Sequence, residues 1–228
     1  MIVLQGSLYI LFTIIVFWFM RMIYYKYKFS ILNPVVTTTA VIIVVLLGMN
    51  INYATYMIGG SWIQEFLGPA VVALAYPLYS QRDTIVRYRF PLVVGLLTGV
   101  TAGIVSGLFY VKVADLDFSY SVSFLPKSVT SPIAMDIAHI SGGIPSLAAA
   151  LVIISGVIGA VIGPKLLNFL KITHYLSVGL GLGCAAHGIG TAKAMEYGEK
   201  EAACSSISMT LSALLYALVL PTTIHYFL

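Results

Sequence analysis

Charged residues are scarce in this sequence. Of its 228 residues only 9% are Asp, Glu, Lys or Arg, whereas 60% are hydrophobic. A soluble globular domain carries about a quarter charged residues, so this chain has too few to cover a surface exposed to water. The composition therefore excludes an ordinary soluble domain.

Several long stretches contain no Asp, Glu, Lys or Arg at all. They are Phe29–Gln64, Phe90–Val111, Ile140–Pro164, Ile172–Ala192 and Ala202–Leu228. A helix needs about 20 apolar residues to cross a bilayer, and each stretch is long enough. A transmembrane β-barrel would instead show alternating polarity in segments of about 10 residues. The sequence predicts an all-α polytopic membrane protein.

Other absences narrow the function. Cys184 and Cys204 have neither a disulfide framework nor metal-ligand spacing. The sequence lacks a Gly-x-Ser-x-Gly elbow, a His-Glu-x-x-His motif and a P-loop, and the Gly-Ile-Gly at 188–190 lacks the third glycine of a dinucleotide fingerprint. We expect no enzyme activity, cofactor or metal. The net charge of +4 comes without a basic stripe interleaved with aromatics, so we expect no nucleic-acid partner.

The hydrophobic segments follow one another without a linker long enough for a soluble domain, so we predict one membrane domain over 1–228. The N-terminus lacks the charged region and cleavage site of a signal peptide, so its first helix is expected to be retained. About six to eight segments are expected to cross the bilayer. The segments lie near 7–25, 34–52, 60–80, 90–112, 120–140, 145–169, 175–193 and 204–227.

Two segments are expected to be broken. Lys and Arg favour the cytoplasmic side of short loops, and Lys165 and Lys171 reach that side only if 120–140 enters from outside and returns. The glycines of 175–193 do not share one helical face and permit unwinding. Broken helices are typical of the midplane sites of secondary transporters, which are often built from inverted repeats. Glycine is also common in membrane helices, and this simpler interpretation stays open.

Two sets of glycines have the spacing of helix-packing seams. Small residues at such a spacing let helices approach closely, so we predict packing rather than ligand binding. The seams would serve equally within this chain, against a partner chain or in a homo-oligomer. They comprise Gly95, Gly99, Gly103 and Gly107, and then Gly156, Gly159 and Gly163.

The stretch 126–132 is the first candidate binding site. Pro126 and Pro132 bracket one cation and several hydroxyls. A helix that starts after either proline would direct free amides at an anion, and the cation would add a full charge. The alternative is that the lysine only extends to the membrane surface. The predicted anion-binding residues are Pro126, Lys127, Ser128, Thr130 and Ser131.

Two further interruptions join this prediction. His187 could exchange a proton with a substrate or bind it, with Gly188 and Gly190 leaving amides free and Thr191 donating a hydroxyl. Alternatively, His187 is a neutral hydrogen-bonding residue. The pair Gly68 and Pro69 interrupts segment 60–80 and frees further backbone groups.

Together these stretches resemble the LrgB/CidB family of bacterial membrane proteins. The motifs that carry the resemblance are Leu-Gly-Pro-Ala at 67–70 with Ala-Leu-Ala-Tyr-Pro-Leu-Tyr at 73–79, Leu-Pro-Lys-Ser-Val-Thr-Ser-Pro-Ile-Ala at 125–134, Gly-Gly at 142–143, the glycines at 156, 159 and 163, and His-Gly-Ile-Gly-Thr-Ala-Lys-Ala at 187–194. The resemblance covers essentially the whole chain.

The resemblance implies a multi-pass protein of the bacterial cytoplasmic membrane with one of two functions. The first is a carrier of small monocarboxylates such as pyruvate, with plastid relatives that move glycolate and glycerate. The second is an antiholin-like or holin-like regulator of murein hydrolase activity and cell lysis. In either case the expected partner is a smaller LrgA/CidA-type membrane protein.

Overall fold

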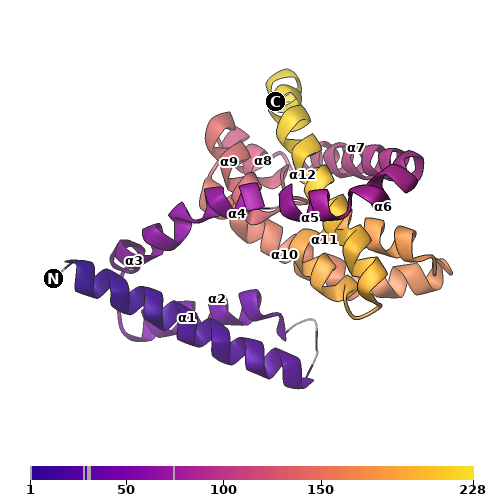
Figure 1. Cartoon of the computed structure of the whole chain (residues 1–228). Coiled ribbons are helices and arrows are strands. Elements are labelled where there is room, and N and C mark those ends of the chain that lie inside the picture. The colour runs from indigo at the N-terminus through magenta and orange to yellow at the C-terminus, as the bar shows by residue number, and fades with distance from the viewer. Residues whose placement is uncertain (1, 28, 30–31, 74) are drawn as a thin grey trace. The chain divides into compact units, whose positions relative to one another are not determined.

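The computed structural model describes residues 2–27, 29, 32–73 and 75–228, and every regular element among them is a helix. Figure 1 shows the course of the chain. It divides into two compact units, Met1–Val72 and Ala73–Leu228, each described by itself. The prediction of an all-α protein is confirmed.

Among the described residues, four helices are long and apolar enough to span a membrane: α1 (Ile2–Tyr27), α7 (Arg89–Val113), α10 (Pro145–Phe169) and α12 (Glu199–Phe227). A shorter apolar helix, α2, covers Pro34–Gly48. These helices agree with a polytopic membrane protein. Other predicted segments are divided into shorter helices instead of forming single spans.

The first unit contains α1, α2 and α3 (Tyr53–Glu65). Asn33 caps α2, because its Oδ1 accepts a hydrogen bond of 3.0 Å from the Val35 amide, and Pro34 occupies the first turn. The predicted segment near 34–52 therefore begins as a helix at Pro34. The helices α1 and α3 approach closely at Gly6 and Gly59, where a Cβ on Gly59 would overlap the carbonyl oxygen of Gly6.

The predicted segment 60–80 is not one helix. The helix α3 ends at Glu65, and α4 (Leu67–Ala73), α5 (Ala75–Ser80) and α6 (Arg82–Arg87) follow. The interruption falls at Phe66, just before the predicted Gly-Pro pair. Proline lacks an amide hydrogen, so Pro69 fits the first turn of α4.

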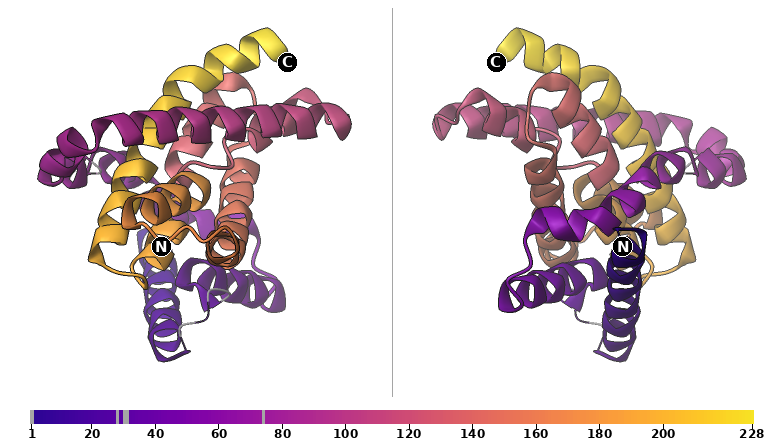
Figure 2. Two further views of the ribbon diagram at one scale, coloured as in Figure 1. Left: turned by 90° about the vertical axis from the view of Figure 1, so that its right-hand side faces the viewer. Right: turned by 90° about the vertical axis from the view of Figure 1, so that its left-hand side faces the viewer.

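The second unit is built around α12, which packs against α11 (Tyr175–Ala194), α7 and α9 (Ser131–Ser141). Figure 2 shows α12 passing across α7. Tyr216 and Leu220 of α12 are fully buried. The long helices also expose large apolar side chains, such as Phe109 and Ile154, as expected of surfaces that face lipid.

The helices α8 (Phe118–Phe124) and α9 form a hairpin, called here the first hairpin. The helix α8 runs back along α7, since the rings of Tyr110 and Phe124 stack with centroids 4.7 Å apart. After the irregular residues 125–130, α9 returns beside α8, and a Cβ added to Gly142 at its end would lie 3.3 Å from Phe118 Cε1 at the start of α8. The Ile144 amide donates a 2.7 Å hydrogen bond to Ser123 Oγ in the last turn of α8. The prediction that 120–140 is broken and returns is confirmed in its geometry.

The helix α11 is bent into a second hairpin. His187 has φ 41° and ψ −128°, a conformation that breaks the helix. Beyond it the chain runs back along its own first half, because a Cβ on Gly190 would overlap the Leu182 carbonyl oxygen. Ala194 lies in one buried cluster with Val178 and Leu182, which a straight helix would separate by about 18 Å or more. The second predicted break is confirmed, and the fold-back goes beyond the prediction.

Cysteine labelling tests this fold-back. In a chain whose Cys184 and Cys204 are replaced by Ser, we expect an impermeant maleimide to label Thr173→Cys and Tyr197→Cys from the same side of the membrane. The residues flank α11, and a hairpin keeps them together. Asp117→Cys, between α7 and α8, is the control and should react from the other side. Labelling of Thr173→Cys and Tyr197→Cys from opposite sides would contradict the hairpin.

Candidate functional site

The tips of the two hairpins meet against the middle of α7. The first hairpin starts near the end of α7 and reaches back to Gly107, where an added Cβ would lie 3.0 Å from Leu125 Cδ2. The second starts near the beginning of α7, where Tyr175 contacts Tyr88. Its tip brings the Cβ of Cys184 within 3.5 Å of a Cβ added to Gly99. Two irregular backbone segments therefore converge from opposite ends at mid-length of a spanning helix.

An open groove of about 660 Å³ lies at this meeting point. One wall is a face of α7 formed by Gly95, Thr98, Gly99, Ala102, Gly103 and Ser106. The second hairpin contributes Leu180, Gly181, Cys184 and Ala185, and the first hairpin contributes Ser128. The groove is mainly apolar with a few hydroxyls, which is the usual composition of a small-molecule site.

Lys127 lies at the tip of the first hairpin, beside the groove. Its Nζ donates a 3.4 Å hydrogen bond to the Gly103 carbonyl and lies 4.8 Å from the centroid of the Phe124 ring. No carboxylate pairs with it among the residues that the structure describes. An ammonium group away from bulk water is costly without a counter-charge. The lysine is therefore positioned to attract an anion.

The backbone at this tip has spare hydrogen-bonding capacity. Thr130 precedes α9 but makes no side-chain cap, so the amides of its first turn, which begins at Ser131, are left uncapped. Thr130 Oγ1 is itself enclosed and has no hydrogen-bond partner among the described residues. Pro126 is buried and helps to hold the irregular segment in place. The arrangement suits an anion or an ordered water.

His187 ties the second hairpin to α10. The ring is buried, and Nε2 lies 2.9 Å from the Val152 carbonyl oxygen. Because a carbonyl only accepts, Nε2 carries the proton. A non-glycine residue at such dihedral angles costs about 1–3 kcal/mol, and this contact helps to offset the cost. His187 does not line the groove, so its proposed exchange of a proton with a substrate stays a prediction.

The other predicted residues of this stretch have different surroundings. Thr191 Oγ1 donates a 2.9 Å hydrogen bond to the His187 carbonyl and shares another of 2.9 Å with Ser205 Oγ. Gly188 is exposed, whereas Gly190 is buried against Leu182. Thr191 and Gly190 therefore hold the fold-back together, and neither lines the groove.

The two glycine sets lie at helix contacts. Cβ atoms added to Gly156, Gly159 and Gly163 of α10 would fall 2.6–2.9 Å from side chains of α11. On α7, Gly107 faces Leu125 and Lys127, and Gly103 faces Tyr216. Gly95, Gly99 and Gly103 also line the groove, a second property that the sequence interpretation did not include.

Gly68 and Pro69 are not brought to this groove by any described contact. Both lie in the first unit, in the first turn of α4, and both are exposed. No described atom lies within 4 Å of a Cβ added to Gly68. Their part in a binding site stays a prediction.

Sequence reasoning missed the hydroxyl residues that line the groove beside the glycines. Thr98 and Ser106 follow Gly95 and Gly103 by three residues, so they share the glycine face. This spacing was a usable signal for a polar surface rather than a packing seam alone. Tyr216 lies against Gly103 beside the groove, and no pattern in the sequence indicated that position. Among the described residues no three His, Cys, Asp or Glu side chains gather as a metal site would require.

Comparisons with known proteins agree over almost the full length. The profile of the LrgB-like family matches residues 13–226. YxaC of Bacillus subtilis (strain 168) is 43% identical over 218 residues, which are 96% of this chain and 95% of that protein. The holin-like protein CidB of Staphylococcus aureus is 35% identical over 223 residues, 98% of this chain and 97% of that protein. No solved structure matches this chain.

Proposed function

This chain belongs to the LrgB-like family, as the sequence motifs predicted, and we propose that it carries small monocarboxylates across the bacterial cytoplasmic membrane. The proposed substrates are anions of the size of pyruvate, glycolate or glycerate. The proposed site comprises the tip 126–131 and the groove beside it. A small LrgA/CidA-type membrane protein is the proposed partner.

The unpaired Lys127 is the observation that carries this proposal. Among the described residues, its ammonium group has a long hydrogen bond to the Gly103 carbonyl and a ring face beside it, but no carboxylate partner. A substrate carboxylate would supply the missing negative charge. Ser128 and the uncapped first turn of α9 would add donors to the carboxylate oxygens.

The two hairpins suggest how such a site could open alternately. The first hairpin follows the end of α7 in the chain, the second begins beside the start of α7, and their tips meet at its mid-length. An inverted pair of broken elements around a central site is typical of secondary transporters. Movement of one tip away from α7 would expose the groove to one side, and movement of the other tip to the opposite side.

Uptake into proteoliposomes tests the proposal. We expect protein-dependent uptake of at least one small monocarboxylate, and we expect Ser128→Ala to lower it about two- to tenfold, the cost of one hydrogen bond of about 0.5–1.5 kcal/mol. Thr222→Ala is the matched control, because it removes an exposed hydroxyl that bonds only the Val219 carbonyl of its own helix. Uptake no greater than that of empty liposomes for every monocarboxylate would refute the carrier function.

A second candidate function comes from the name of a relative. CidB of Staphylococcus aureus is called holin-like, and a holin-like or antiholin-like regulator would act through contact with a partner. The small-residue face of α7 lines an open groove, and small residues favour close contact with another membrane helix. Under this alternative, control of murein hydrolase activity and lysis would survive substitution of Lys127, and a small membrane protein or a second copy would co-purify.

A further inference from the structure

A second pocket lies away from the groove, where α7, α11 and α12 begin. It has a volume of about 300 Å³ and combines two cations with three hydroxyls. Arg87 and Thr84 come from α6, Tyr88 from the junction with α7, Tyr175 from the start of α11 and Lys200 from the first turn of α12.

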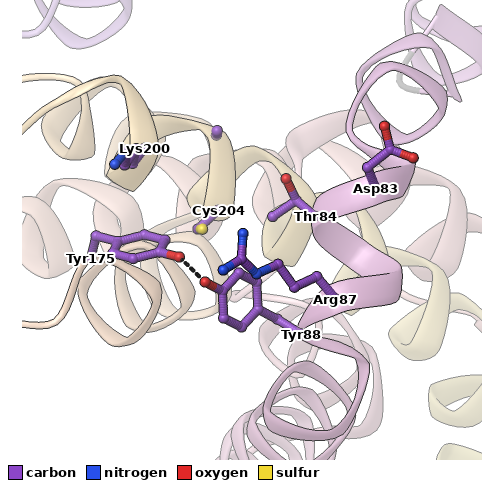
Figure 3. A pocket seen from close by; sticks show the side chains of 8 residues that line it. Asp83, Thr84, Arg87, Tyr88, Tyr175, Lys200 and Cys204 are labelled. Atoms are coloured by element: carbon purple, nitrogen blue, oxygen red, sulfur yellow. Dashed lines mark hydrogen bonds between the residues drawn. The ribbon is translucent and has the colours of Figure 1, made fainter.

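Figure 3 shows how the side chains face one another. Tyr175 donates a hydrogen bond to the Tyr88 hydroxyl, so the Tyr88 proton is left to donate elsewhere. The Arg87 guanidinium lies beside this pair, 5.4 Å from the centroid of the Tyr88 ring. Lys200 Nζ lies 5.8 Å from the centroid of the Tyr175 ring.

The residues that line the pocket carry more positive than negative charge. Within the described part of the chain neither Arg87 nor Lys200 forms an ion pair. Asp83 also lines the pocket, but its carboxylate points away from the Arg87 guanidinium in Figure 3. Glu201 lies over Gly198, where its Oε2 is 2.6 Å from the place a Cβ would take. Two cations and a free hydroxyl proton therefore remain available to one ligand.

We infer that this pocket binds a phosphate group through Arg87, Lys200 and the Tyr88 hydroxyl. Guanidinium and phosphate match in geometry and form paired hydrogen bonds. The pocket lies at the ends of membrane helices, in a region whose Lys and Arg residues indicate the cytoplasmic side. Basic pockets between helices on that side suit the headgroups of anionic lipids, and free phosphate presents the same chemistry. The inference does not depend on the carrier function.

Binding measurements separate the two sources. For protein purified in detergent, we expect inorganic phosphate to raise the unfolding temperature relative to potassium chloride of equal ionic strength. If a lipid is the source, native mass spectrometry should instead detect retained phosphatidylglycerol. In either case we expect the double variant R87Q/K200Q to bind at least about tenfold more weakly, because each charged hydrogen bond contributes about 1.5–3 kcal/mol.

The control is R89Q/K165Q, which removes the same charges from exposed positions outside the pocket. Tyr88→Phe adds a milder variant, expected to weaken binding severalfold without a change in charge. The inference is overturned if wild type binds neither phosphate nor phosphatidylglycerol, or if R87Q/K200Q binds as tightly as R89Q/K165Q. Because no uptake is measured, neither result bears on carboxylate transport.

Discussion

Replacement of Lys127 by Gln is expected to reduce carboxylate uptake to near the level of empty liposomes. The substitution keeps most of the length of the side chain but removes the only charge at the tip of the first hairpin. A hydrogen bond to a charged group contributes about 1.5–3 kcal/mol, which corresponds to about a 10- to 100-fold loss of affinity. The measurement is initial uptake of labelled pyruvate, glycolate and glycerate into proteoliposomes.

The matched control is Lys112→Gln, which removes an exposed cation from the last turn of α7, outside the groove. Lys127→Arg gives an intermediate test, because it keeps the charge but places a planar fork where a compact ammonium was. We expect it to retain part of the uptake that Lys127→Gln loses. Undiminished flux of every carboxylate in Lys127→Gln would remove this residue from the proposed site.

The largest loss of stability is expected for Gly190→Ala. A methyl group there would overlap the Leu182 carbonyl oxygen and lie 2.7 Å from Ala186 Cβ. A backbone oxygen cannot turn aside as a side chain can, so the fold-back of α11 would have to open. Overpacking costs about 1–3 kcal/mol, and in a chain of this size it would lower the midpoint of thermal unfolding by about 2–12 °C.

Gly181→Ala is the control on the same helix. No described atom lies within 4 Å of the place its Cβ would take, and alanine is favoured over glycine in helices by about 1 kcal/mol. We expect Gly181→Ala to match or exceed wild type in thermal unfolding monitored in detergent. If the two variants are equally stable, the second half of α11 does not lie against the first.

The breaks in the helices were predictable because their causes are local. Proline has no amide hydrogen and is disfavoured in a helix interior, so Pro126 and Pro132 marked the tip of the first hairpin, although α10 and α12 continue through Pro164 and Pro221. Off-period glycines marked the second. The return of 120–140 was also predictable, since straight crossing conflicted with the positions of Lys165 and Lys171.

The side chains in and beside the groove were less predictable. Lys127 and Ser128 were identified from their own motif, but Cys184 and Tyr216 had no signal in the sequence. They come to the groove region because α11 and α12 pack on α7, a contact between segments about a hundred residues apart. His187 had the right position for a break, yet its ring points to Val152 on a different helix. A direction of that kind depends on a partner and not on neighbours in sequence.

By itself the sequence determined that this protein resides in a membrane, that it is helical, and where its helices cannot continue. These properties follow from side-chain transfer energies and backbone chemistry, which act residue by residue. Only the tertiary structure decided that α11 turns back on itself, that the two tips meet on the small-residue face of α7, and that Arg87 and Lys200 share one pocket. Each of these depends on which distant surfaces bury one another, and apolar faces of similar composition do not encode that choice locally.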